Sequence, residues 1–252
     1  MRSVILHIFL AVACSGIVLA QTAPDEFERG NAFYRDGKYD QAVSAYESIL
    51  KQGLASSSLY FNIGNCYFRL GRIAPAILAY ERALRLQPND GDIKHNLNLV
   101  NLKTPDRIEP LPELFFIEWL RSFSAVVPLH TIARLFAVCW LLLFAGLSIF
   151  YLLANPTILR LLRGLAIASA VALIPLTIIL VTQIVDSRNR TDAVITASVV
   201  TAKTSPDAQS VDAFVAHEGL KVKLSDAVGE WIKIVLPDGK VGWIREQNCE
   251  RI

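Results

Sequence analysis

The sequence has few cysteines, no block of like charge and no motif of a known catalytic centre. Four cysteines are scattered through 252 residues without a CxxC pair, which argues against a disulfide framework and a zinc site. Only Cys66 and Cys249 lie where they could meet in a folded region. The 25 basic and 23 acidic residues are interspersed, so the clustered basic face of a nucleic-acid-binding protein is missing. HExxH, GxSxG and phosphate-loop motifs are absent, and we expect no enzyme activity, no cofactor and no metal site.

Charged residues are also missing from two long stretches, 135–154 and 165–185. At about 1.5 Å per residue, each stretch covers the roughly 30 Å hydrocarbon core of a bilayer. The sequence therefore predicts two transmembrane helices joined by a loop over residues 155–164. That loop carries Arg160 and Arg163 and no acidic residue, which favours the cytoplasmic side of the membrane.

Small residues recur every four positions along the second stretch, at Gly164, Ala168 and Ala172. Such a stripe permits close contact with the first span or with a helix of a partner protein. We expect Pro175 to kink the helix just beyond the stripe. Because no ionisable residue falls in the middle of either stretch, the hairpin is predicted to be an anchor and not a transport pathway.

Residues 1–20 have the pattern of a secretory signal peptide: a basic start, an apolar run over Val4–Ala13, and small residues before Gln21. We expect cleavage after Ala20, with a lipoprotein leader ending before Cys14 and an uncleaved anchor as the alternatives. Exported by this leader, the segments on either side of the hairpin would lie on the periplasmic side of a bacterial inner (cytoplasmic) membrane.

Residues 25–88 repeat themselves with a period of 34. The matched pairs are Phe27/Phe61, Gly30/Gly64, Asn31/Asn65, Phe33/Tyr67, Tyr34/Phe68, Arg35/Arg69, Gly37/Gly71, Ala42/Ala76 and Tyr46/Tyr80. This pattern resembles the tetratricopeptide repeat, in which small residues let two helices approach and aromatic residues fill the space between neighbours. We expect repeats at about 25–55 and 59–88 within a module spanning 21–103. Because two repeats alone are only marginally stable, a helix over 90–103 is expected to close the stack.

The resemblance implies that the first helix of each repeat lines a concave groove. The groove residues it implies are Asn31, Tyr34, Arg35, Asn65, Phe68, Arg69 and Lys103. Two arginines and a lysine at the 34-residue step, beside two amides, could clamp an acidic segment of an extended peptide. The alternative is that these residue types are common at these positions in such repeats, whatever the repeats bind.

The segment 104–130 connects the repeats to the first span. Three prolines in Thr104–Pro112 predict an extended connector. An amphipathic helix is expected to follow, with the apolar face Phe115, Phe116, Trp119, Leu120 and Phe123. Such a helix is typical of the lipid bilayer interface, although packing against the membrane domain of a partner is the alternative.

Residues 191–252 contain short β-rich runs, and Asp238-Gly239 between two of them predicts a hairpin turn in a small all-β barrel. The Trp231-Ile232-Lys233-Ile234 run and the Asp238–Ile244 run that follows it resemble the end of bacterial SH3-like domains. The resemblance implies a cleft at Trp231 and Trp243 for a peptide or a peptidoglycan fragment, or else indoles that fill the barrel core. Upstream, Ala202–Pro206 lacks the Arg and Gly that this family usually has where its ligand cleft forms.

The fold class expected overall is a multi-domain membrane protein: an all-α repeat module, a two-helix transmembrane hairpin and an SH3-like barrel. This order resembles the BatE-type proteins of the bacterial aerotolerance (Bat) group. The resemblance implies a non-catalytic membrane scaffold of an envelope stress complex, with von Willebrand A-domain membrane proteins and a MoxR-type ATPase system as partners. The alternative is a peptidoglycan-binding or envelope-sensing protein that acts through its SH3-like domain.

Overall fold

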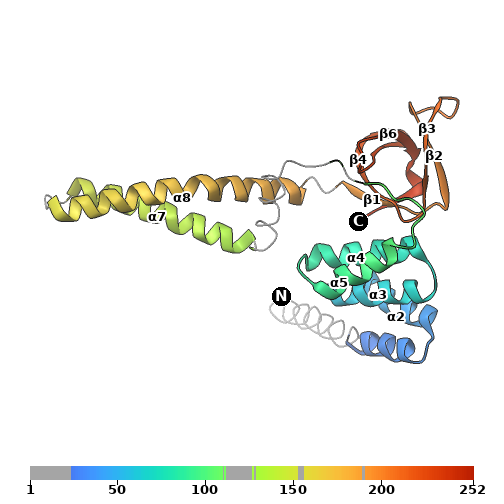
Figure 1. Cartoon of the computed structure of the whole chain (residues 1–252). Helices are drawn as coiled ribbons and strands as arrows, with labels where there is room; N and C mark the ends of the chain where they lie inside the picture. Colours follow the sequence, from blue (N-terminus) through green and yellow to red (C-terminus); the bar gives the residue numbers. More distant parts are fainter. Residues whose placement is uncertain (1–23, 110, 112–126, 128, 153–155, 189–190) are drawn as a thin grey trace, which may run out of the picture. The chain divides into compact units, whose positions relative to one another are not determined.

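The computed structural model describes residues 24–109, 111, 127, 129–152, 156–188 and 191–252 (Figure 1). The chain divides into two compact units. The first combines Met1–Leu111 with Thr191–Ile252, and the second is Pro112–Arg190. The predicted signal peptide and the predicted amphipathic helix lie outside the described residues.

The repeat module is a stack of antiparallel helices (Figure 1). A helix over residues 24–35 is followed by α2 (Tyr39–Lys51), α3 (Ser57–Arg69), α4 (Ile73–Leu86) and α5 (Gly91–Asn101). The first residues of α3 and α5, Ser57 and Gly91, are one repeat period apart. The Asp90 side chain accepts hydrogen bonds from the N–H groups of Asp92 and Ile93, at 3.0 and 3.1 Å, and so caps α5.

The period of 34 has a steric cause in the contact between the two helices of each repeat. A Cβ atom added at Gly64 would lie 2.6 Å from Cε1 of Tyr80, and Gly30 faces Tyr46 in the same way. Both tyrosine rings are buried. Glycine is required at these two positions because any side chain would push the paired helices apart.

Replacing Gly64 with alanine is expected to lower the melting temperature of the chain in detergent. The added methyl group displaces the Tyr80 ring, at a cost of about 2 kcal/mol that exceeds the gain of about 1 kcal/mol in helix propensity. The matched control is Gly91→Ala, because a Cβ at Gly91 meets no atom within 4 Å. The control should be neutral or slightly stabilising; equal effects of the two changes would contradict the steric explanation.

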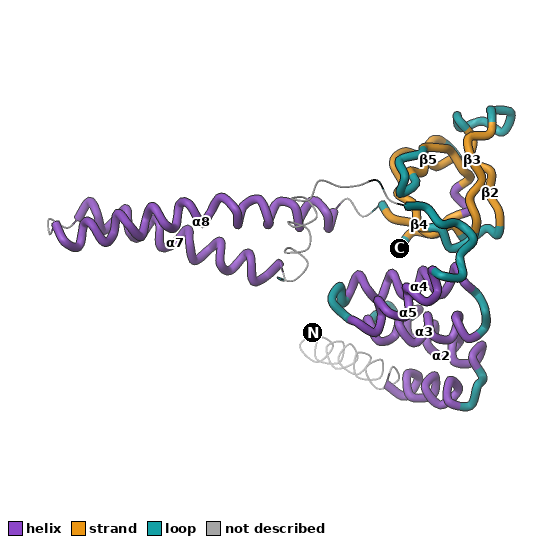
Figure 2. The backbone as a smooth tube through the Cα atoms, in the orientation of Figure 1, coloured by secondary structure: helices purple, strands orange, loops and turns teal. Residues whose placement is uncertain are grey.

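The β domain is an antiparallel sheet of seven strands within residues 191–252, in the order β3-β2-β6-β5-β4-β1-β7. The strands are β1 (Asp192–Ile195), β2 (Val199–Lys203), β3 (Asp212–His217), β4 (Lys221–Val228), β5 (Trp231–Val235), β6 (Val241–Arg245) and β7 (Cys249–Arg251). Figure 2 shows the sheet curling round on itself. Its inner face carries a buried apolar cluster that includes Val222, Ile232, Ile234 and Ile244. The turn between β5 and β6 contains Gly239 at φ +86°, as the Asp-Gly pair predicts.

The β domain packs against the repeat module and completes its core. Val194 of β1 is fully buried, yet it belongs to the apolar cluster of α4 and α5 with Ile77, Leu97 and Val100. Ile252 packs against the same cluster. We expected α5 alone to close the helical stack, but β1 covers it as well. This strand comes from the part of the chain that follows the predicted membrane hairpin.

Ion pairs surround this contact between the two modules. Lys221 Nζ lies 2.8 Å from Oε2 of Glu81, whose side chain is only 11% exposed, and 3.5 Å from Oδ2 of Asp192. Arg82 Nη2 lies 2.8 Å from Glu250 Oε1. Since a largely buried carboxylate is costly without a partner, Lys221 ties the orientation of the β domain to α4.

The connector after α5 is bound along the β domain, although its prolines predict only an extended chain. The Asp106 carboxylate accepts the backbone N–H of His217 at 2.7 Å and contacts Nδ1 of the same histidine at 2.8 Å. Ile108 packs against the β-domain core, and the Leu111 N–H donates to the Pro237 carbonyl at 3.1 Å. The connector is thus an ordered edge of the β domain.

The second unit contains two antiparallel helices, α7 (Leu129–Leu152) and α8 (Pro156–Arg188) (Figure 1). Stretches of both, Leu129–Ser148 and Thr157–Val185, are long and apolar enough to cross a membrane. The predicted loop over 155–164 is wrong, because α8 already begins at Pro156. Proline is favourable in the first turn of a helix, and the arginines that suggested a loop are good helix formers.

The first two residues of the small-residue stripe of α8 do not make the close approach to α7. Gly164 and Ala168 are exposed, and a Cβ at Gly164 would meet nothing within 4 Å. The close approach occurs at Gly146 of α7, where a Cβ would lie 3.8 Å from the Leu162 carbonyl and 3.9 Å from Ala166 Cβ. The predicted contact with the first span is therefore wrong at Gly164 and Ala168, while Ala172 is half-buried.

Candidate binding groove

Two hydrogen-bonded clusters of tyrosine and asparagine connect the first helices of the repeats. Asn31 Oδ1 accepts from Tyr46 Oη at 2.7 Å and from Asn62 Nδ2 at 3.2 Å. One repeat later, Asn65 Oδ1 accepts from Tyr80 Oη at 2.7 Å and from Asn96 Nδ2 at 2.9 Å. We call this set of six residues the tyrosine–asparagine ladder. It fixes the orientation of the asparagine amides across the helix 24–35, α3 and α5.

The ladder is insensitive to pH over the physiological range. Burial is the largest cause that raises the pKa of Tyr46 to about 12, and burial also raises the pKa of Tyr80. Both hydroxyl groups therefore remain protonated donors at neutral pH. Because the tyrosine hydroxyls keep their protons, they continue to donate to Asn31 and Asn65. The side-chain carbonyl oxygens of these two asparagines therefore accept hydrogen bonds from within the protein.

Three basic residues, Arg35, Arg69 and Lys103, follow one another at the repeat period; we call them the basic row. Arg69 Nε donates to Tyr39 Oη at 3.0 Å, and its guanidinium lies 5.4 Å from the centre of the Tyr39 ring. Lys103 Nζ lies 4.6 Å from the centre of the Phe68 ring. Aromatic rings thus support two members of the basic row.

The basic row keeps its charge available. Arg35, Arg69 and Lys103 are exposed, and within the described residues none of them forms an ion pair with a carboxylate. Nearby acids are paired with other cations: Asp36 with Lys38 at 3.2 Å, and Asp40 with Arg72 at 3.0 Å. The row can therefore bind an external anion without breaking an internal ion pair.

A small cavity of about 160 Å³ lies at the first repeat. The predicted residues Asn31, Tyr34 and Arg35 line it, together with Tyr46 and Asn62. The other predicted groove residues, Asn65, Phe68, Arg69 and Lys103, do not line this cavity and continue the surface along α3 and beyond α5.

Sequence reasoning missed Asn62 and Asn96 as groove residues. Asn62 and Asn96 are separated by one repeat period, and Glu28 occupies the equivalent position in the first repeat. That spacing was visible in the sequence, but the residues are not part of the repeat pattern that carries the resemblance.

On the β domain, Trp231 and Trp243 lie on the outer face of β5 and β6. Trp231 pairs with Arg245, and Trp243 pairs with Lys233, while the alternate residues of both strands face the core. Lys233 Nζ lies 5.9 Å from the centre of the Trp243 ring, and Lys203 pairs with Trp243 from the other side. Although it lies outside the barrel core, Trp243 is only 9% exposed.

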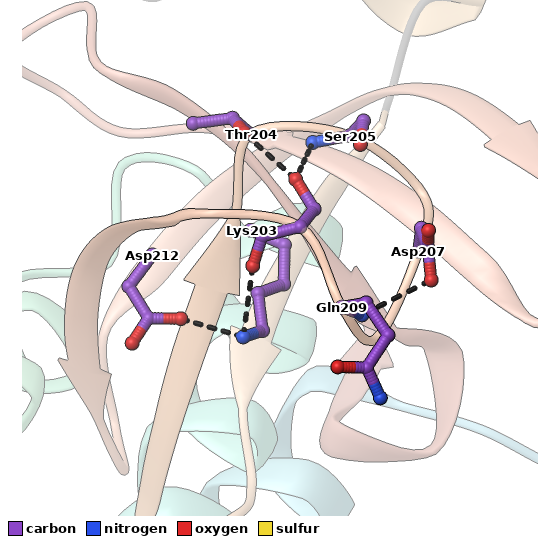
Figure 3. A network of polar contacts seen from close by, with 7 residues as sticks. Lys203, Thr204, Ser205, Asp207, Gln209 and Asp212 are labelled. Atoms are coloured by element: carbon purple, nitrogen blue, oxygen red, sulfur yellow. Dashed lines mark hydrogen bonds and ion pairs between the residues drawn. The ribbon is translucent and has the colours of Figure 1, made fainter.

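The loop between β2 and β3 is closed by its own polar contacts (Figure 3). Lys203 Nζ donates to Asp212 Oδ1 at 2.6 Å and to the Ser210 carbonyl at 3.1 Å. The Ser210 hydroxyl lies 2.7 Å from that of Thr204 and accepts the Ser205 N–H at 3.1 Å. This is the stretch that lacks the Arg and Gly of the SH3-like pattern, and its lysine is held by Asp212.

The described residues hold no group of three potential metal ligands. Cys66 and Cys249 are free thiols, so they do not form a disulfide. Burial raises the pKa of Cys66 to about 12, and the pKa of Cys249 to about 11. Neither is a reactive thiolate at neutral pH.

The comparison with family models agrees with the helical stack. A family model described as tetratricopeptide repeat matches residues 27–91. The chain is also similar to a solved structure, the first tetratricopeptide domain of Spaghetti (RPAP3) bound to the HSP90 peptide SRMEEVD. It is 21% identical, with 32% of this chain and 92% of that chain covered and a TM-score of 0.21. No match was found among curated proteins.

The family match defines the class of the repeat module and not that of the whole chain. Residues 27–91 form a tetratricopeptide-like module, a class that generally mediates protein–protein interaction without catalysis, and no catalytic family was found. The chain adds two long apolar helices and a separate antiparallel sheet domain to this module.

Proposed function

We propose that the protein is a non-catalytic membrane scaffold whose repeat groove binds an acidic, extended segment of a partner protein. The observation that carries the proposal is the basic row beside the fixed amides of Asn62 and Asn96. Asparagine side chains held by the ladder hydrogen-bond the backbone of an extended peptide, because an amide offers both a donor and an acceptor. Arg35, Arg69 and Lys103 then select carboxylates along that peptide.

The two apolar helices anchor this scaffold in a bilayer. Support comes from their length and composition, and from the lack of ionisable residues in the middle of each. Since Val194 packs into the core of the repeat module, the chain segments before α7 and after α8 must lie on the same side of the membrane. An even number of crossings satisfies this condition, and the predicted leader supports a location of both modules on the periplasmic side of a bacterial inner membrane.

A topology measurement tests this arrangement. Alkaline phosphatase fused through a flexible linker after Ile252 is expected to be active, because the enzyme matures only outside the cytoplasm. The same enzyme inserted at residue 154, between the two helices, should be inactive. An inactive fusion after Ile252 or an active one at residue 154 would show that the sidedness is wrong.

The order of the modules supports a more specific proposal for the partners. Leader, repeats, two spans and β domain together resemble the BatE-type aerotolerance proteins, which favours von Willebrand A-domain membrane proteins and a MoxR-type ATPase system as partners. The second candidate function is binding of peptidoglycan by an SH3-like β domain. The half-buried Trp231, with the Arg245 guanidinium 5.7 Å from its ring centre, is the feature that favours it.

Crosslinking in intact cells, followed by detergent purification and mass spectrometry, tests the scaffold function. The native chain should capture membrane proteins that the Arg35→Ala/Arg69→Ala variant loses, and a Trp231→Ala variant should retain them. If the native chain captures no protein but pellets with purified sacculi, and Trp231→Ala abolishes pelleting, the peptidoglycan function replaces the scaffold function.

A further inference from the structure

A second cleft lies on a different part of the first unit from the binding groove. It is formed by α2, α3 and α4 of the repeat module and by the turn after β1 and the start of β7. Its volume is about 210 Å³. It shares no lining residue with the cavity of the binding groove, and the β domain contributes Thr196 and Glu250 to its lining.

The lining of this cleft combines apolar side chains with carboxylates. Leu50, Ile63 and Leu78 contribute apolar surface, and Glu47 and Glu250 contribute the carboxylates. One unpaired acid therefore faces apolar surface that would cover the hydrocarbon part of a long side chain.

Hydrogen bonds hold both carboxylates in place. The Tyr67 hydroxyl donates to Glu47 Oε1 at 2.8 Å, and Arg82 Nη2 donates to Glu250 Oε1 at 2.8 Å. Arg82 is further held by the carbonyl of Arg251 at 2.8 Å. Glu250 is neutralised by Arg82, but within the described residues Glu47 forms no ion pair, so the cleft keeps one net negative charge.

We propose that this cleft, the Glu47 cleft, binds a lysine or arginine side chain presented by a partner protein. The aliphatic stem of that side chain covers Leu50 and Leu78, and its cation meets the free oxygen of Glu47. A basic occupant is favoured because it neutralises the one carboxylate without an ion pair, whereas an acidic occupant would be repelled by it. A purely apolar occupant would desolvate the Glu47 charge with only the neutral Tyr67 hydroxyl as its partner. The site recognises basic segments and the groove recognises acidic ones, so one chain can hold two surfaces of opposite charge.

The test uses the full-length chain in detergent micelles and a fluorescein-labelled tetra-arginine peptide as the probe, followed by fluorescence anisotropy. Glu47→Gln keeps the acceptor for Tyr67 but removes the charge, and should weaken binding about tenfold. Thr196→Arg places a cation in the cleft from its own wall and should abolish binding. The matched control is Glu230→Gln, which removes an exposed charge of the β domain outside the cleft and should leave binding unchanged.

Absence of binding to the native chain, or equal weakening by Glu47→Gln and Glu230→Gln, would overturn the proposal. The Arg35→Ala/Arg69→Ala variant should bind tetra-arginine as the native chain does. Failure of the Glu47 cleft can therefore be distinguished from failure of the groove, since the two sites use different residues and probes of opposite charge.

Discussion

Replacing Val194 with aspartate is expected to detach the β domain from the repeat module and to destabilise the first unit by about 3 kcal/mol or more. Val194 is fully buried among α4 and α5 and lies outside the β-barrel core cluster. The nearest cations, Lys221 opposite residue 194 on β4 and Arg82 of α4, are already paired with Glu81 and Glu250. A carboxylate buried at position 194 must therefore be solvated, which requires the modules to separate. Limited proteolysis and thermal unfolding of the chain in detergent measure the effect.

Val199→Asp is the matched control, because Val199 begins the next strand and is 58% exposed. It introduces the same charge and should leave both proteolysis and melting temperature near those of the native chain. If Val194→Asp behaved like this control, the β domain would not be a component of the repeat core, and the sidedness argument for the membrane would lose its basis.

The second large effect is expected at the basic row. Arg35→Ala/Arg69→Ala should weaken binding of the acidic partner segment about 100-fold, since each arginine supplies a charge-assisted hydrogen bond worth about 1.5 kcal/mol or more. Isothermal titration of the captured segment into the full chain measures this change. The native affinity should also fall steeply with salt, because the groove cations are exposed.

Arg85→Ala is the matched control for the groove. Arg85 is an exposed arginine of α4 outside the basic row, and within the described residues it forms no ion pair. Its removal lowers the charge of the module without touching the groove and should leave the affinity within about twofold of native. Equal losses from Arg85→Ala and from the double variant would mean that only the overall charge of the module matters.

The helical stack could be read from the sequence because its determinants are local and repeated. Gly64 and Tyr80 mark one close approach, Gly30 and Tyr46 mark the same approach one period earlier, and Asp90 caps the helix that follows. At each of these positions the residue type itself indicates one local geometry. The Asp238-Gly239 turn was predictable for the same reason.

The docking of the β domain could not be read from the sequence. In the sequence, Val194 cannot be distinguished from a strand residue that faces the core of its own sheet. Lys221 pairs with Glu81, which lies 140 positions earlier in the chain. No periodicity or turn chemistry signals a contact of that range. The extent of α8 was misjudged for a different reason: Arg160 and Arg163 precede the uncharged stretch, but arginine is a good helix former and α8 includes both residues.

The candidate site was predictable in part. The basic row follows from the 34-residue period, but Asn62 and Asn96 emerged only from their hydrogen bonds to Asn31 and Asn65. The burial of Trp243 between Lys203 of β2 and Lys233 of β5 depends on the register of β2, β6 and β5, which the sequence does not specify.

Site-specific photo-crosslinking from the groove tests the central claim most directly. A benzophenone amino acid at Tyr34, which lines the cavity beside Arg35, is compared in intact cells with the same group at Gln209 in the exposed loop between β2 and β3. We predict a partner adduct from position 34 that disappears when Arg69 and Lys103 are changed to alanine, and none from position 209. An adduct from position 34 that survives these changes, or adducts from position 209 alone, would contradict an acidic segment bound along the basic row.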